Sequence, residues 1–230
     1  MARLFSVVTS LLCVLVLTPS TAVADQINFN GTTLSKVVTI GGSNLNNYHG
    51  EVRAGEMSWT WAGTPPAGFA QSFYSYCVDL SHVVTTPQYV TVRSTEGFTN
   101  GVEDGGRKAA WLFNQYAAGI HQMADVTTAA LYSAGLQIAI WEAIYDTTAN
   151  LSGGGFTATT SNTTVMNTAA NYLSALYQSD MVGVATILDS TRSTGQDQIV
   201  AQVSEPSTLM LMGLAFFGFA LLARRPVVVT

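Results

Sequence analysis

Ser72-Phe73-Tyr74-Ser75-Tyr76-Cys77-Val78-Asp79 is an apolar, aromatic-rich stretch, and residues of these types are enriched in half-buried β-strands. It contains Cys77, whereas the chain's other cysteine, Cys13, lies near the N-terminus. If Cys13 is removed with a leader segment, Cys77 is the one thiol of the mature chain. Oxidising compartments favour paired cysteines, so an exported protein must cap, hide or use such a sulfur.

The N-terminus has the three parts of a secretory signal peptide. Met1-Ala2-Arg3 is a short basic start, residues 4–17 are mostly apolar, and Ala22-Val23-Ala24 has the small-x-small form of a cleavage site. The apolar run is shorter than the roughly 20 residues that span a bilayer, which disfavours the alternative of an uncleaved anchor. We therefore expect residues 1–24 to be removed by cleavage between Ala24 and Asp25.

The C-terminal segment, residues 204–230, has the pattern of a membrane-inserted tail. Ser204-Glu205-Pro206 precedes an apolar run over residues 209–223, and Arg224-Arg225 follows it. A basic stop after an apolar segment is typical of a transmembrane segment with its positive end in the cytoplasm. We expect 209–223 to be a transmembrane segment.

The order of these parts resembles the PEP-CTERM sorting signal of Gram-negative bacteria, which an exosortase recognises and processes. The resemblance covers residues 204–225. It departs from the usual pattern at Ser204, which replaces the first proline, and in residues 226–230, which extend past the arginines. The alternative is an ordinary single-span C-terminal anchor. With the signal peptide, the sorting signal implies export to the envelope, outer surface or extracellular matrix.

The body of the chain, residues 25–203, is acidic and carries few charges. It holds 6 basic and 13 acidic residues, a formal net charge of −7, and its longest basic cluster is Arg107-Lys108. Binding to nucleic acid or to an anionic membrane surface needs a basic patch, so the composition argues against both partners. Its length is sufficient for one domain with its own core.

The first half of this body predicts strands and the second half predicts helices. Turn-forming residues, such as Gly63-Thr64-Pro65-Pro66, separate four β-like runs at 33–40, 48–61, 70–84 and 89–93. Helical spacing follows at 106–119, at 125–146 with a possible pause at Gly135, and at 163–177, before a closing strand at 181–188. We predict an α+β domain with an antiparallel β-sandwich or barrel-like part over about 27–95 and a helical part over about 106–180.

The second helical segment carries a glutamine that needs a partner. Leu136-Gln137-Ile138-Ala139-Ile140-Trp141 places Gln137 among apolar residues, where a buried amide is costly unless it is hydrogen-bonded. A buried lone thiol at Cys77 has a redox problem of its own. Both problems vanish if the thiol attacks the Gln137 carboxamide, expels ammonia and forms a thioester.

These two motifs together resemble the bacterial thioester domain, a family best known at the tips of Gram-positive adhesins and pili. Tyr76-Cys77 matches a cysteine that follows an aromatic residue, and Gln137-x-Ala139-Ile140-Trp141 matches the helix that opens with the family's glutamine. The segment 107–116 is similar to the helix between them. Order, spacing and flanking residues agree over roughly residues 30–190.

The resemblance implies a covalent adhesion chemistry. Gln137 would be the acyl donor and Cys77 the leaving group when a lysine amine, or another nucleophile, attacks the thioester carbonyl. Tyr76 and Trp141 would shield the bond from water, although both residues also fit the role of plain core aromatics. No cofactor is implied and the protein is not expected to be an enzyme. The partner, a surface protein or a polysaccharide, is open.

Three alternatives compete with this hypothesis. A cysteine hydrolase would need an oriented histidine near Cys77, yet alternation along a strand places His82 on the opposite face, and His49 and His121 lie in loop-like surroundings. A passive structural protein of the envelope or matrix, with an unreacted buried Cys77, remains open. Metal binding is the weakest, because four acidic residues lack a ligand spacing, namely Asp79, Glu103, Asp104 and Asp146.

Overall fold

The computed structural model describes residues 24–201 except 47, 100–101 and 191–194. Most of the expected signal peptide and the whole sorting tail, with its 209–223 segment, lie outside the described residues. Within the described part, no helix is both long and apolar enough to cross a membrane. Ala24 and Asp25 are described, and Asp25 is the first residue of strand β1, so the expected cleavage site immediately precedes this strand.

Six strands close into an antiparallel barrel. Each strand pairs with the next in the order β2-β3-β7-β6-β4-β1, and β1 pairs back with β2. The N-terminal part of β1 takes part in both closing pairs, because Ile27 pairs with Trp61 of β2 and with Gln88 of β4. The barrel-like part is thus confirmed. The strands are β1 (Asp25–Gly41), β2 (His49–Trp61), β3 (Ser72–Cys77), β4 (Gln88–Ser94), β6 (Thr186–Ser190) and β7 (Gln198–Val200).

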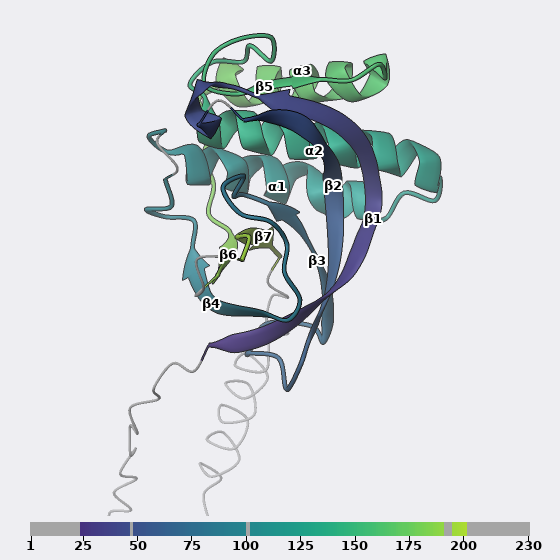
Figure 1. Ribbon diagram of the computed structural model, residues 1–230, viewed down its shortest axis with the longest axis vertical. Coiled ribbons are helices and arrows are strands. Elements are labelled where there is room, and N and C mark those ends of the chain that lie inside the picture. The colour runs from purple at the N-terminus through teal and green to yellow at the C-terminus, as the bar shows by residue number, and fades with distance from the viewer. Residues whose placement is uncertain (1–23, 47, 100–101, 191–194, 202–230) are drawn as a thin grey trace, which may run out of the picture.

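Strands β1 and β2 continue beyond the barrel as a long curved hairpin (Figure 1). The register shifts between Phe29 and Gly31 and again between Thr32 and Ser35, and such irregularities bend and twist a strand pair. Gly55 has a φ of 137° where β2 crosses Leu34, and a Cβ there would lie 2.1 Å from the Leu34 carbonyl oxygen. The short strand β5 (Thr157–Thr159) adds to the far end of β1.

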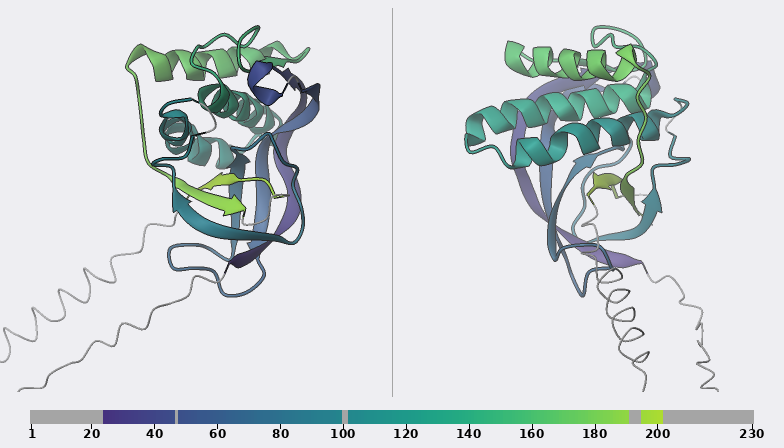
Figure 2. Two further views of the ribbon diagram at one scale, coloured as in Figure 1. Left: turned by 60° about the vertical axis from the view of Figure 1, so that its left-hand side comes forward. Right: turned by 180° about the vertical axis from the view of Figure 1, so that it is seen from behind.

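Three helices form a layer over one end of the barrel, and the curved hairpin wraps around them (Figures 1 and 2). Helix α2 (Val126–Tyr145) is central and is buried on all sides from Ser133 to its end. It begins at Asp125, whose side chain accepts a hydrogen bond from the Thr127 N–H. Helices α1 (Gly105–His121) and α3 (Thr163–Gln178) pack beside it.

The structure confirms the α+β fold and corrects three local predictions. Helix α2 continues through Gly135 without a pause. The glycine allows α3 to pack closely against α2, since a Cβ there would lie 2.7 Å from the Thr168 side chain. The strand predicted to run to residue 84 ends at Cys77. The predicted closing strand begins only at Thr186, and a second one, β7, follows it.

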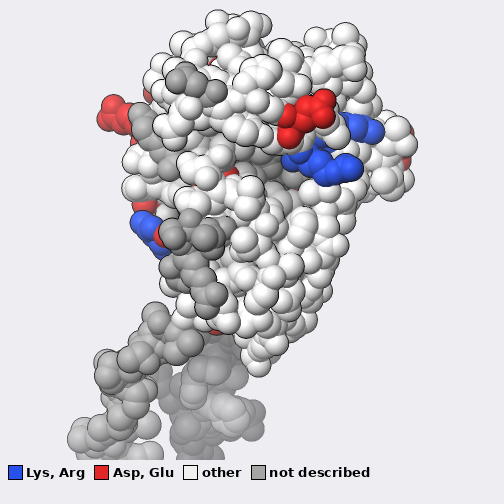
Figure 3. All heavy atoms as spheres, in the orientation of Figure 1, with Lys and Arg blue, Asp and Glu red and all other residues white. Residues whose placement is uncertain are grey.

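Charged side chains are sparse on the surface. On the face shown in Figure 3, they are few and occur in small separate groups. This arrangement agrees with the low charge content of the sequence.

Candidate functional site around Cys77 and Gln137

The main chain of Cys77 lies where strand β3 loses one of its neighbours. Backbone groups of alternate residues in β3 point toward β2 and toward β7, and Val78 continues the β7 side by donating to the Asp197 carbonyl. On the β2 side, the last pair is Met57 with Ser75. The N–H and C=O of Cys77 therefore face a position that strand β2 no longer occupies.

The carboxamide of Gln137 fills this position. The Cys77 N–H donates to Gln137 Oε1 at 2.9 Å, and Gln137 Nε2 donates to the Cys77 carbonyl oxygen at 2.8 Å. Both residues are fully buried, with Gln137 at 0% exposure and Cys77 at 1%. The side chain acts as one more rung of the sheet, so it satisfies two backbone groups that burial would otherwise make costly. The two predicted residues are in direct contact.

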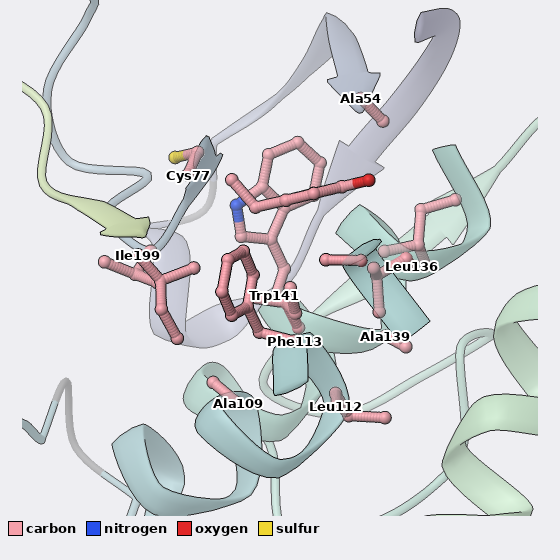
Figure 4. Close-up of a cluster of buried hydrophobic side chains, with 14 of the residues drawn as sticks. Ala54, Cys77, Ala109, Leu112, Phe113, Leu136, Ala139, Trp141 and Ile199 are labelled. Atoms are coloured by element: carbon pink, nitrogen blue, oxygen red, sulfur yellow. The ribbon is translucent and has the colours of Figure 1, made fainter. Parts of the chain in front are cut away.

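The thiol of Cys77 is protonated and held by its own loop. It is a free cysteine, and its Sγ donates to the Asp79 carbonyl oxygen at 3.0 Å. Burial raises the pKa of the thiol well above its usual range, and contacts with Trp141 and the Asp79 backbone offset only part of this effect. In Figure 4 the sulfur points away from the labelled side chains of α1.

Tyr76 and Trp141 occupy different sides of strand β3. Tyr76 is buried against the helices, with its ring edge on Phe113 and its hydroxyl 3.0 Å from Ser133 Oγ. Because neighbouring side chains of a strand alternate, Tyr76 lies on the face opposite to the thiol. Trp141 lines the same cavity as Cys77, and its buried indole N–H makes no hydrogen bond of normal geometry within the described chain. The predicted shielding role stays a prediction for both residues.

A cavity of about 470 Å³ opens beside the thiol. Cys77 lies in its wall together with His82, and Arg53 adds a cationic side chain. The rest of the lining is mostly apolar, and includes Phe29, Val52, Met57, Leu80, Val84 and Trp141. A small molecule or a side chain with an apolar stem can therefore reach the neighbourhood of Cys77 from outside.

The position of His82 differs from the sequence prediction. Alternation placed it on the face opposite to Cys77, but the strand ends at Cys77 and the chain turns back, so both residues line one cavity. His82 Nδ1 lies 2.6 Å from Asp79 Oδ2, and the Ser81 N–H donates to Asp79 Oδ1 at 2.7 Å. Tyr145 supports the same turn through its hydroxyl, which accepts from the Leu80 N–H.

The other two histidines lie away from this cavity's His82–Asp79 pair. His49 is exposed at the start of β2, while His121 ends α1 and pairs with the buried Glu56, its Nδ1 lying 2.9 Å from Oε2. The His121 ring also stacks on Tyr74, with a centroid separation of 4.0 Å.

Three of the four acidic residues that were weighed as metal ligands have structural partners of their own, Asp79 being held by His82. Asp104 pairs with Arg107, and Glu103 lies beside it before α1. Asp146 accepts hydrogen bonds from the backbone N–H groups of Thr147 and Gly155. Among residues 24–201 where they are described, no three acidic, histidine or cysteine side chains are grouped to hold a metal ion.

Glu142 was missed by the sequence reasoning. It lies on α2 close to Trp141, has 0% exposure, and neither carboxyl oxygen has a hydrogen-bond partner within the described residues. Burial, with the nearby charge of Asp146, raises the pKa of this carboxyl to about 8. A lone acidic residue in the otherwise apolar segment 138–145 is the signal that could have identified it.

The comparisons with known proteins concern the sorting tail and the folded domain. Residues 202–225 match the PEP-CTERM protein-sorting motif. The chain carries a PEP-CTERM sorting signal. This confirms the predicted signal and indicates an exported protein of the cell envelope or surface. No curated protein matches the chain. Among solved structures, it is similar to the N-terminal thioester domain of a surface protein from Clostridium perfringens, with 11% identity, a TM-score of 0.41, and coverage of 74% of this chain and 99% of that one.

Proposed function

We propose that Cys77 and Gln137 form an internal thioester through which the exported protein captures a nucleophile on a partner covalently. The observation that supports this proposal is the double hydrogen bond between the Gln137 carboxamide and the main chain of Cys77. It holds the carboxamide carbon beside the residue that carries the thiol, in a buried site. Holding two reacting groups together in this way removes much of the entropic barrier to their reaction.

The bond forms with the loss of one ammonia. The Cys77 sulfur attacks Gln137 Cδ, the C–N bond breaks, and the thiol proton leaves with the amide nitrogen. The Cys77 N–H already donates to Oε1, the oxygen on which negative charge develops, so it would stabilise the tetrahedral intermediate. The Cys77 side chain must first turn from the Asp79 carbonyl toward Gln137, which is a rotation about Cα–Cβ.

Capture is the reverse exchange with a different nucleophile. A partner amine, such as that of a lysine side chain, attacks the former Gln137 carbonyl, the C–S bond breaks, and an amide crosslink remains with a free Cys77 thiol. The cavity of about 470 Å³ offers a path to the site, and its apolar walls limit water that would hydrolyse the bond. Each molecule reacts once, so the protein is a reagent for adhesion and not an enzyme, and the chemistry needs no cofactor.

The sorting signal gives this chemistry a location. A PEP-CTERM signal at residues 202–225 supports recognition by an exosortase, with transient membrane attachment through residues 209–223 before processing. The reactive domain would then face the cell exterior or the extracellular matrix. There it would meet the amine of a surface protein or a nucleophile of a polysaccharide, which gives the protein an adhesin-like role.

The second candidate is a passive structural protein of the envelope or matrix. It is favoured by one feature of the same site: both polar groups of the Gln137 carboxamide are satisfied without any bond to sulfur. The raised pKa of Cys77 also makes the free thiol a poor nucleophile. In this case the pair only holds strand β3 against helix α2.

Intact mass separates the two candidates. The freshly purified exported domain should be lighter than its sequence mass by one ammonia, and methylamine should raise that mass by one methylamine. Cys77→Ala and the isosteric Gln137→Glu should each abolish the deficit, whereas Gln115→Glu, at an exposed position on α1, should keep it. A full sequence mass with a titratable thiol in unhydrolysed protein would exclude the thioester.

A further inference from the structure

The cavity beside Cys77 contains a histidine whose orientation is fixed by a buried carboxylate. His82 is 37% exposed in its side chain and Asp79 is 7% exposed, and the 2.6 Å contact joins Nδ1 to Oδ2. The carboxylate oxygen accepts from Nδ1–H, which fixes the tautomer, so that in the neutral ring Nε2 keeps its lone pair. Within the described chain, no hydrogen bond is made by Nε2. A histidine with a free proton-accepting nitrogen in its neutral form therefore lines the same cavity as Cys77.

We propose that His82 is the base that accepts the proton of the attacking nucleophile during capture, with Asp79 as its positioning residue. This inference rests on the thioester of the proposed function. As the amine nitrogen bonds to Gln137 Cδ, its proton passes to His82 Nε2, and the C–S bond breaks. The proton then passes to the departing Cys77 sulfur. The amide forms, the thiol is restored and His82 returns to its neutral state, so that every atom and proton is accounted for.

Asp79 links the histidine to the sulfur directly. Its carboxylate holds His82, and its backbone carbonyl accepts the Cys77 thiol at 3.0 Å. One residue therefore places the base and the leaving group on the same side of the cavity. Once the sulfur has taken up the proton, the restored thiol would donate again to the Asp79 carbonyl oxygen, as it does in the structure.

Two acidic side chains act on His82. Asp79 contacts the ring, and the charges of Asp197 and His82 act on each other across the turn, where burial raises the pKa of the Asp197 carboxyl to about 6. Arg53 is the one opposing cation among the described residues that line the cavity. The loop is also tied down, since Gln196 Nε2 donates to the His82 carbonyl oxygen at 3.1 Å. A base on a fixed turn near two acidic groups suits proton transfer.

The test measures the rate of methylamine capture in three proteins: His82→Gln, Asp79→Asn and the unchanged exported domain. Intact mass, recorded over time, gives each rate. The ammonia deficit should persist in His82→Gln, while capture slows about a hundredfold, a typical contribution of a general base. A solvent deuterium isotope effect on capture should be present in the unchanged domain and absent in His82→Gln. His49→Gln, at an exposed histidine outside the cavity wall, should behave as the unchanged domain. Asp79→Asn should also slow capture.

Each outcome decides between the hypotheses. An unchanged rate and isotope effect in His82→Gln would overturn the role of His82 and leave the thioester intact. Loss of the ammonia deficit in that variant would assign His82 to thioester formation and would also overturn the proposal. If the unchanged domain has its full sequence mass, the thioester itself is absent and both proposals fall. Because His82 is partly exposed, its replacement leaves the core packed, and an unchanged melting temperature will verify this.

Discussion

Gln137 and Glu142 are two fully buried polar side chains on the same helix, and their surroundings are opposite. The Gln137 carboxamide makes two hydrogen bonds to the backbone of strand β3, at 2.9 and 2.8 Å. The Glu142 carboxyl has 0% exposure and no hydrogen-bond partner in the described structure. Burial raises the pKa of this carboxyl, and the nearby charge of Asp146 raises it further.

A buried polar group can therefore either raise or lower the free energy of unfolding, depending on whether its hydrogen bonds are satisfied. A satisfied amide fixes the register between a helix and a strand, because any shift of either element leaves four polar groups without partners. An unsatisfied carboxyl contributes nothing of this kind and must stay protonated to remain buried. Substitutions at the two positions should therefore change the free energy of unfolding in opposite directions.

The largest expected effect is that of Gln137→Leu, measured in a Cys77→Ala background so that no thioester can form. The contact with Gln137 uses only the main chain of residue 77, so it persists in that background. Leucine leaves the N–H and C=O of residue 77 buried without partners, at about 1 to 3 kcal/mol each, so the free energy of unfolding should fall by about 4 kcal/mol.

Urea unfolding of the two proteins measures this loss. Gln115→Leu in the same background is the matched control, since this glutamine is exposed on α1 and its replacement should change stability by no more than about 0.5 kcal/mol. Equal stabilities of Gln137→Leu and its parent would show that the double hydrogen bond does not hold β3 against α2.

The next effect is a gain of stability in Glu142→Gln. The pKa of this carboxyl rises from 4.5 when unfolded to about 8 when folded, so the folded state binds its proton more tightly. The contribution of this carboxyl to the free energy of unfolding is therefore fully present below pH 4.5. It is lost as pH rises toward 8, by about 1.4 kcal/mol per pH unit. At pH 7 the neutral glutamine should be more stable by about 3 kcal/mol.

The pH profile is the decisive measurement for this variant. Between pH 5 and pH 8, roughly the range bounded by the two pKa values, the difference in unfolding free energy between Glu142→Gln and the parent should grow steadily. Asp125→Asn, at the exposed start of α2, is the control. Its difference in unfolding free energy from the parent should not grow between roughly pH 5 and pH 8. A constant difference across the interval would mean that Glu142 is ionised in the folded protein.

The sequence allowed the contact between Cys77 and Gln137 to be predicted because each residue alone was costly. A buried amide and a buried lone thiol, both in apolar segments, needed a common explanation. Helix α2 was predicted to within one residue at each end, because Asp125 is a good N-cap and the apolar spacing continues to Tyr145. The resemblance to a sorting signal was readable from the order of its parts alone.

The remaining features depend on tertiary contacts that no local pattern contains. Strand β3 ends at Cys77 although Val78 could continue it, because the turn is fixed by hydrogen bonds that the Leu80 and Ser81 N–H groups donate to the Tyr145 hydroxyl and the Asp79 carboxylate. The pairing of His82 with Asp79 follows from that ending and was therefore missed. Strands β5 and β7 have three residues each, which is too short for a periodic signal, and their pairing partners alone define them.

The smallest predicted effect is that of Tyr76→Phe, which concerns a third buried polar group on α2. Ser133 Oγ accepts from the Glu56 N–H at 2.9 Å and shares a second hydrogen bond with the Tyr76 hydroxyl. Removal of that hydroxyl leaves Ser133 half satisfied, so the free energy of unfolding should fall by about 1 kcal/mol. This value lies between the large loss at Gln137 and the gain at Glu142.

The same variant also distinguishes the two aromatic residues that were expected to shield the bond. Because Tyr76 faces the helices and Trp141 lines the cavity, Tyr76→Phe should leave the ammonia deficit and its rate of decay by hydrolysis unchanged. Trp141→Phe should make the deficit decay faster, since a smaller ring admits water beside the thiol. Equal decay rates in the two variants would remove the shielding role from Trp141, whereas faster decay in Tyr76→Phe would mean that water reaches the site from the helix side.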